Sequence, residues 1–128
     1  MKLFDTTVGK LEAALDVRLE RQNVLNGNIA NVDTPGYVPR ELDFSRALAA
    51  AEAARNQTGP GEQRPMTADP SEFVKVAPEF TGGLDGNGVD LDKTMVELAR
   101  NSLLYGAAAK AVGKKLAILR YVATDGIG

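Results

Sequence analysis

A stripe of apolar side chains near the C-terminus constrains the fold more than any other feature of this sequence. It begins at Leu91 and recurs every four or three residues, which is the period of one face of an α-helix. Asp90 stands where an N-cap residue belongs, and the pattern continues to about Thr124, so the predicted helix is on the order of 50 Å long. The stripe consists of Leu91, Met95, Leu98, Ser102, Tyr105, Ala109, Val112, Leu116, Leu119 and Ala123.

A second stripe of the same period lies near the N-terminus, from about Phe4 to Asn31. It predicts a second long helix, which Asp5 or Thr6 would cap at its start. Pro35 disfavours helical backbone at the residue before it, and the glycine that follows favours a turn, so the helix is expected to end there. The stripe consists of Phe4, Val8, Leu11, Leu15, Arg18, Gln22, Leu25, Ile29 and Val32, with two polar members in its middle.

The segment between the two helices carries weaker patterns. Phe44–Arg55 is rich in alanine and favours a helix, although a face of alanines has little to bury. Asn56–Pro70 is polar and rich in glycine and proline, which predicts a mobile loop. Glu72–Phe80 alternates weakly and predicts a short strand or an extended segment, and Thr81–Gly88 predicts turns. One structural domain with three parts is expected: an N-terminal helix and turn (1–37), an irregular or mobile middle (38–88) and a C-terminal helix (89–128).

Two long helices with narrow apolar stripes cannot each bury a stripe alone, so we expect the two stripes to pack on each other. The predicted fold class is all-α, with the N- and C-terminal helices packed as a coiled-coil-like hairpin and an irregular, partly extended middle segment. Such a chain is marginally stable by itself, because its stripes are narrow and its middle is polar. Neighbouring copies would bury the remaining apolar surface, which favours a protein that assembles.

The composition argues against catalysis and against metal or cofactor binding. The 128 residues include no histidine and no cysteine, which removes the commonest general base and the commonest metal ligands. The acidic run Asp85–Asp92 superficially resembles a calcium loop, but its twelfth position is Val96, where a bidentate glutamate is needed. A small hydrolase with a Ser or Asp nucleophile stays a minor alternative. We therefore expect no enzymatic activity, no cofactor and no metal site.

Charge and hydropathy argue against two further classes of function. The formal net charge is −2, so no strong cationic field attracts nucleic acid or an anionic lipid surface. No stretch of the chain approaches the roughly 20 apolar residues that a membrane span needs. The first ten residues, Met1–Lys10, lack the apolar region of a cleaved signal peptide. We expect no nucleic-acid partner and no direct insertion into a membrane.

The Asn-rich segment Asn28–Tyr37 supports two interpretations. In the first, Asn31 and Asp33 end the helix, and Pro35 and Gly36 make a turn. In the second, amide side chains on one face of the helix bond to another subunit, since an amide carries both a donor and an acceptor. The candidate amides are those of Gln22, Asn23, Asn28 and Asn31.

Short motifs at both ends of the chain carry a family resemblance. They are Arg21–Leu25, Asn28–Asn31, Asp33–Tyr37 and Leu42–Phe44 near the N-terminus, and Val89–Asp92, Asn101, Ser102 and Tyr105 towards the C-terminus. Together they resemble the terminal signatures of bacterial flagellar rod and hook proteins. The resemblance covers residues 8–44 and 86–125, about 60% of the chain.

The resemblance implies a structural subunit of the proximal rod of the flagellar basal body. Such a subunit polymerises through its terminal helices to form the drive shaft and the wall of the export channel. Its implied partners are copies of itself, other flagellar rod proteins, and the junction proteins of the membrane ring and export apparatus at the rod base. The implied location is the periplasmic rod, reached through the flagellar type III apparatus without a cleaved signal peptide.

The candidate site is therefore a subunit interface rather than a pocket. A small helical-hairpin adaptor or export chaperone is the alternative, and a monomer of constant mass would favour it. The expected interface residues are Leu11, Leu15, Gln22, Leu25, Asn28, Ile29, Asn31, Leu91, Met95, Leu98, Ser102, Tyr105, Val112, Leu116 and Leu119.

Overall fold

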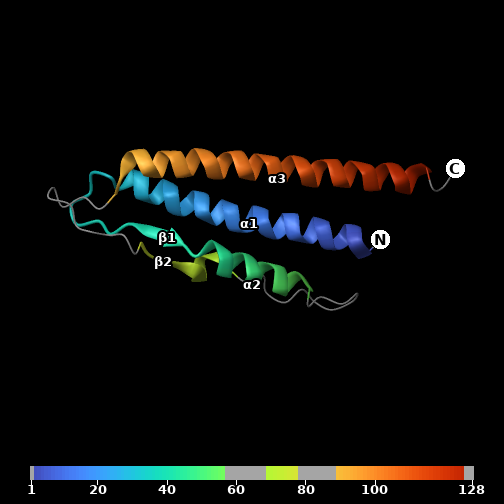
Figure 1. Cartoon of the computed structure of the whole chain (residues 1–128), viewed down its shortest axis with the longest axis horizontal. Helices are drawn as coiled ribbons and strands as arrows, with labels where there is room; N and C mark the ends of the chain where they lie inside the picture. Colours follow the sequence, from blue (N-terminus) through green and yellow to red (C-terminus); the bar gives the residue numbers. More distant parts are fainter. Residues whose placement is uncertain (1, 57–68, 78–88, 126–128) are drawn as a thin grey trace.

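Three layers make up the part of the chain that the computed structural model describes, residues 2–56, 69–77 and 89–125. Figure 1 shows α3 on one side, α1 in the middle, and α2 with two short strands on the other side. The elements in chain order are α1 (Lys2–Ala30), β1 (Arg40–Leu42), α2 (Phe44–Asn56), η1 (Pro70–Phe73), β2 (Val74–Val76) and α3 (Leu91–Asp125). The predicted all-α class, with long terminal helices packed side by side, is confirmed.

The start of α3 is capped as the sequence predicts. The Asp90 Oδ1 accepts a hydrogen bond from the backbone N–H of Lys93 at 3.0 Å, and its carbonyl accepts one from the N–H of Thr94 at 2.9 Å. The cap expected at Asp5 or Thr6 is wrong, because α1 already begins at Lys2 and runs through both residues. No glycine or proline stands between Lys2 and Thr6 to oppose the extra turn.

The chain leaves α1 through the predicted turn. The carbonyl of Asn31 accepts the N–H of Thr34 at 3.0 Å, and the carbonyl of Thr34 accepts the N–H of Tyr37 at 3.2 Å. Gly36 adopts a φ of 73°, the left-handed conformation that only glycine enters at little cost. The turn directs the following residues back along α1.

A two-stranded antiparallel sheet forms in the middle of the chain. Leu42 of β1 pairs with Val74 of β2, and Arg40 pairs with Val76. The strand β2 lies inside the predicted extended segment Glu72–Phe80 and confirms it for residues 74–76. The sequence gives no signal for β1, because three residues are too few to display an alternating pattern.

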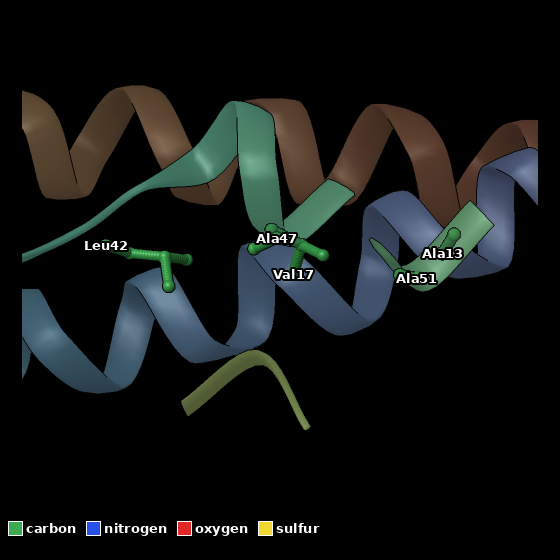
Figure 2. Close-up of a cluster of buried hydrophobic side chains, with 5 residues drawn as sticks. All are labelled: Ala13, Val17, Leu42, Ala47 and Ala51. Atoms are coloured by element: carbon green, nitrogen blue, oxygen red, sulfur yellow. The ribbon is translucent and has the colours of Figure 1, made fainter. Parts of the chain in front are cut away.

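The most buried apolar cluster joins α1 to α2 (Figure 2). Ala47 and Ala51 of α2 are only 1% and 7% exposed, and they lie against Ala13 and Val17 of α1, with Leu42 beside them. The expectation that the alanine face of Phe44–Arg55 has little to bury is therefore wrong. Small side chains let two helices approach closely, so a face of alanines packs densely without large residues.

Part of the predicted middle falls outside the described residues. This applies to most of the loop Asn56–Pro70, namely residues 57–68, and to the turns predicted at Thr81–Gly88.

Candidate functional site

A polar crossing joins α1 to α3 near the middle of both helices. The Nδ2 of Asn101 donates to the carbonyl of Arg18 and to the Oε1 of Gln22, both at 2.9 Å. The Gln22 Nε2 donates to the Oγ of Ser102 at 3.1 Å. Asn101 is 2% exposed, and its Oδ1 has no hydrogen-bond partner among the described residues. Because these amides pair across the two helices, they fix the register of α3 on α1.

The face of α3 that packs on α1 differs from the predicted stripe. Thr94 and Asn101 are the buried residues of α3, while Leu98, Val112 and Leu119 are half-buried. The expectation that the whole apolar stripe forms the seam with α1 is wrong, because Asn101, which lies outside the stripe, is buried against α1 while several members of the stripe are exposed. The exposed members of the predicted stripe are Leu91, Met95, Ser102, Tyr105, Ala109, Leu116 and Ala123.

The apolar predicted residues of α1 and Gln22 are at least partly covered by the rest of the chain. Leu25 is buried, and Leu11, Leu15, Gln22 and Ile29 are half-buried. Of this group, only Gln22 makes a side-chain hydrogen bond to α3. The most buried residues of α1, Ala13 and Val17, lie outside this group, and a role of the group in a subunit interface stays a prediction.

Asn28 holds the turn and β1 against α1. Its Oδ1 accepts hydrogen bonds from the Tyr37 hydroxyl and from the backbone N–H of Arg40, both at 3.0 Å. Its Nδ2 donates to the carbonyl of Arg40 at 2.8 Å, and the residue is 5% exposed. This amide therefore has a role within the chain, where the sequence interpretation offered a bond to another subunit.

Asn31 is half-buried and also bonds within its own chain. Its Nδ2 donates to the carbonyl of Gly27 at 2.8 Å, and its Oδ1 accepts from the hydroxyl of Thr34 at 3.2 Å. These are the contacts of a residue that ends a helix, as in the first interpretation of the Asn-rich segment. A contact of Asn31 with another subunit stays a prediction.

Two arginines of α1 lie over one aromatic ring. The guanidinium carbon of Arg18 is 4.8 Å from the centroid of the Phe44 ring, and that of Arg21 is 5.6 Å away. Burial, with the nearby charges of Arg21 and Arg100, lowers the pKa of Arg18 from its usual value. The ring of Phe44 thus attaches the start of α2 to α1 by cation–π contact.

Arg55 ties the other end of α2 to α1. Its guanidinium nitrogens lie 2.7 Å from the Glu12 Oε2 and 2.6 Å from the Asp16 Oδ2. The arginine side chain is 18% exposed, and the two carboxylates are 41% and 54% exposed. These two ion pairs contribute modestly to the stability of the chain because solvent reaches both acidic groups.

The outer face of α3, opposite α1, is a candidate interface that sequence reasoning missed. Val96, Leu103, Ile118 and Tyr121 are 68%, 74%, 56% and 67% exposed. The signal was available as a second seven-residue spacing, from Val96 to Leu103 and from Lys114 to Tyr121. The ten-residue stripe that begins at Leu91 is the stronger pattern, so this second spacing was not recognised.

Neither metal chemistry nor a membrane span emerges from the described residues. Within residues 2–56, 69–77 and 89–125, no group of three or more acidic side chains is placed to hold a metal ion. Among these same residues, no helix combines the length and the apolar character needed to cross a membrane. Half of the calcium-like run Asp85–Asp92, residues 85–88, lies outside the described residues.

Comparisons with known proteins agree with the terminal motifs. No protein-family model matches the chain. A flagellar basal body rod protein FlgB of Bacillus subtilis is 33% identical over 98% of this chain and 99% of its own length. The FlgB proteins of Aeromonas hydrophila and Salmonella typhimurium are 35% and 34% identical, each over 88% of this chain and 89% of their own length. With such identity over nearly the full length of both sequences, the chain belongs to the FlgB family of flagellar basal body rod proteins.

Proposed function

We propose that this chain is a structural subunit of the proximal rod of the flagellar basal body and polymerises through its terminal helices. The assembled helices form part of the drive shaft and of the wall of the export channel. Membership of the FlgB family supports the rod assignment. The motifs of the Asn-rich segment and of α3 support the same reading.

The exposed apolar surface of α3 is the observation that carries this proposal. Leu91, Met95 and Leu116 of the predicted stripe are 39%, 54% and 47% exposed. The outer face of the same helix carries further exposed apolar residues between its lysines, so α3 offers hydrophobic side chains on more than one side. A helix with apolar residues all round is typical of a buried position, and large exposed apolar patches mark protein interfaces. Neighbouring subunits would supply the missing cover.

The partners in this proposal are copies of the chain, other flagellar rod proteins, and the junction proteins of the membrane ring and export apparatus. The chain reaches the periplasmic rod through the flagellar type III apparatus, without a cleaved signal peptide. Its role is mechanical rather than enzymatic. The export route and the mechanical role both rest on membership of the family. The exposed apolar surface of α3 is compatible with a position inside the rod.

The test is incorporation into basal bodies in cells that lack their own copy of the gene. We expect the epitope-tagged wild-type chain to restore motility and to copurify with basal bodies. Leu116→Asp should do neither, whereas Ala49→Asp, which places the same charge on the exposed side of α2, should do both. A wild-type chain that stays a soluble monomer and never enters the basal body would overturn the proposal in favour of an adaptor or export chaperone.

A further inference from the structure

A groove runs along the side of α1 that neither α2 nor α3 covers. One hollow of about 290 Å³ is lined by Asp16, Leu19, Glu20 and Asn23 of α1, and a second of about 420 Å³ is lined by Glu20, Asn23 and Gly27. The two hollows share Glu20 and Asn23, so they lie next to each other along the helix. The far wall consists of residues from the turn after α1, β1, α2, η1 and β2, among them Arg40, Arg55 and Val74.

The α1 side of this groove has the period and the shape of a helix-packing surface. Asp16, Leu19, Asn23 and Gly27 are spaced by three or four residues, so they share one face of α1. Gly27, and Gly9 further along the same face, have no heavy atom within 4 Å of the point where a Cβ would stand. Glycines at such positions leave holes that a large side chain of another helix can fill.

The outer ridge of α3 has the complementary shape. We define it as Val96, Leu103, Lys110, Lys114, Ile118 and Tyr121, all exposed and all on the side of α3 away from α1. Leu103 and Tyr121 are large apolar side chains of this ridge and are 74% and 67% exposed. The two lysines between them make no ion pair within the described residues.

The acidic residues on the α1 side of the groove match the lysines of the ridge, while Arg55 and Arg40 stand on the far wall. Glu20 lies where the two hollows meet, and within the described residues it has no ion-pair partner. Asp16, four residues earlier, is half-exposed even though it pairs with Arg55. Lys110 and Lys114 on the ridge are likewise four residues apart, which is one helical turn.

We infer that the outer ridge of α3 docks into the α1 groove of the next copy of this chain. The inference rests on the proposed rod function and names one of its contacts. With Lys110 opposite Glu20 and the two helices antiparallel, equal helical rise places Lys114 opposite Asp16. The same register places Leu103 opposite Gly27 and Tyr121 opposite Gly9, so each of these large side chains lies over the open space that a glycine leaves on α1.

The antiparallel direction follows from the fold. Within one chain α1 and α3 run in opposite directions (Figure 1). Copies related by rotation about, and translation along, an axis parallel to the helices keep the helix directions, so the α3 of one copy runs opposite to the α1 of the next. Groove and ridge are different surfaces, which makes the contact heterologous and allows it to propagate along a polymer.

Disulfide trapping in assembled basal bodies tests this contact directly, because the chain has no cysteine of its own. The variant carries Gly27→Cys and Leu103→Cys, and the oxidised basal bodies are separated without reductant. We expect a ladder of dimers and longer species, because each copy offers one partner at each surface. The matched control is Gly27→Cys with Ala117→Cys, an exposed residue 14 positions further along α3, and it should stay monomeric.

A charge exchange provides the second measurement. Glu20→Lys and Lys110→Glu should each lower the yield of basal bodies about fivefold, the change that an exposed ion pair at the upper end of its usual range supports. The double variant should restore the yield, which a merely structural role of either residue would not produce. Glu72→Lys, at an exposed position that lines neither hollow, is the control and should leave the yield unchanged.

The outcomes separate this inference from the proposed function. Motile cells whose double-cysteine chain is incorporated but yields only monomers overturn the docking contact and leave the rod assignment intact. Crosslinks only to a different rod protein also overturn it, because the occupant of the groove is then not a second copy. A wild-type chain absent from basal bodies refutes the rod assignment itself.

Discussion

The two contacts that α1 makes within the chain differ in kind. The apolar side chains at its contact with α2 are already buried within the single chain, with Val17 fully buried and Ala47 1% exposed. Its contact with α3 is longer and is fixed by the amides of Gln22 and Asn101, while the remaining sides of α3 stay exposed. The first contact belongs to the stability of the single chain. The second leaves apolar surface uncovered, and this surface is what an assembling subunit needs.

Val17→Asp should break the first contact, and it is the change with the largest expected effect on the free chain. A carboxylate without a partner in the cluster of Figure 2 should lower the free energy of unfolding by about 3–5 kcal/mol. Thermal unfolding followed by circular dichroism measures the loss. Asn23→Asp introduces the same charge at an exposed site of the same helix and should change the midpoint little. Equal midpoints for the two variants would show that the α1–α2 contact does not stabilise the chain.

Asn28→Ala should have the next largest effect. It leaves the N–H and carbonyl of Arg40 and the hydroxyl of Tyr37 without their partner, at a cost of about 1–3 kcal/mol. Asn26→Ala, at an exposed position of the same helix, is the control. Denaturant unfolding of the purified chain compares them. If the Asn28 variant unfolds like the wild type but fails to assemble, the amide acts between subunits, as the second sequence interpretation holds.

Arg55→Leu tests how much the ionic tie adds to the apolar contact between α1 and α2. The expected loss is about 1 kcal/mol or less, since solvent reaches both Glu12 and Asp16. The difference between variant and wild type should shrink in 1 M salt, because screening weakens the pair in the wild type. A loss that is independent of salt would mean that the arginine acts by packing its aliphatic stem rather than by its charge.

The long helices and the turn follow from the sequence because they depend on local signals. A period of three or four residues predicts α3, Asp90 predicts its cap, and Pro35 with Gly36 predicts the end of α1. The faces of α3 do not follow in the same way. Which side packs on α1 depends on amides such as Asn101 that bond across 79 residues of sequence, and no local pattern records that pairing.

The burial of the alanines and the outer ridge were missed for related reasons. Ala47 and Ala51 are small, so a hydrophobic stripe gives them little weight, yet they are buried because Ala13 and Val17 lie opposite. Leu103 and Tyr121 belong to a sparser repeat whose lysines lower its apolar character. In both cases the partner surface, on another element or another copy, determines what a residue does.

Leu116→Asp distinguishes most clearly between residues that stabilise the single chain and residues that bind neighbouring copies, although its expected effect on the free chain is the smallest. Leu116 is 47% exposed, so aspartate there costs only the helix-propensity difference, about 0.5 kcal/mol. In the rod the same carboxylate would lie in an apolar contact without a partner, which costs several times more and recurs in every copy. We expect an unfolding midpoint close to that of the wild type together with loss of rod assembly.

Leu98→Asp should also abolish assembly, but it should destabilise the free chain as well, because Leu98 is half-buried beside α1. If Leu116→Asp instead unfolded the free chain as Val17→Asp does, α3 would be completing the fold of its own chain, and its exposed stripe would not be reserved for neighbours.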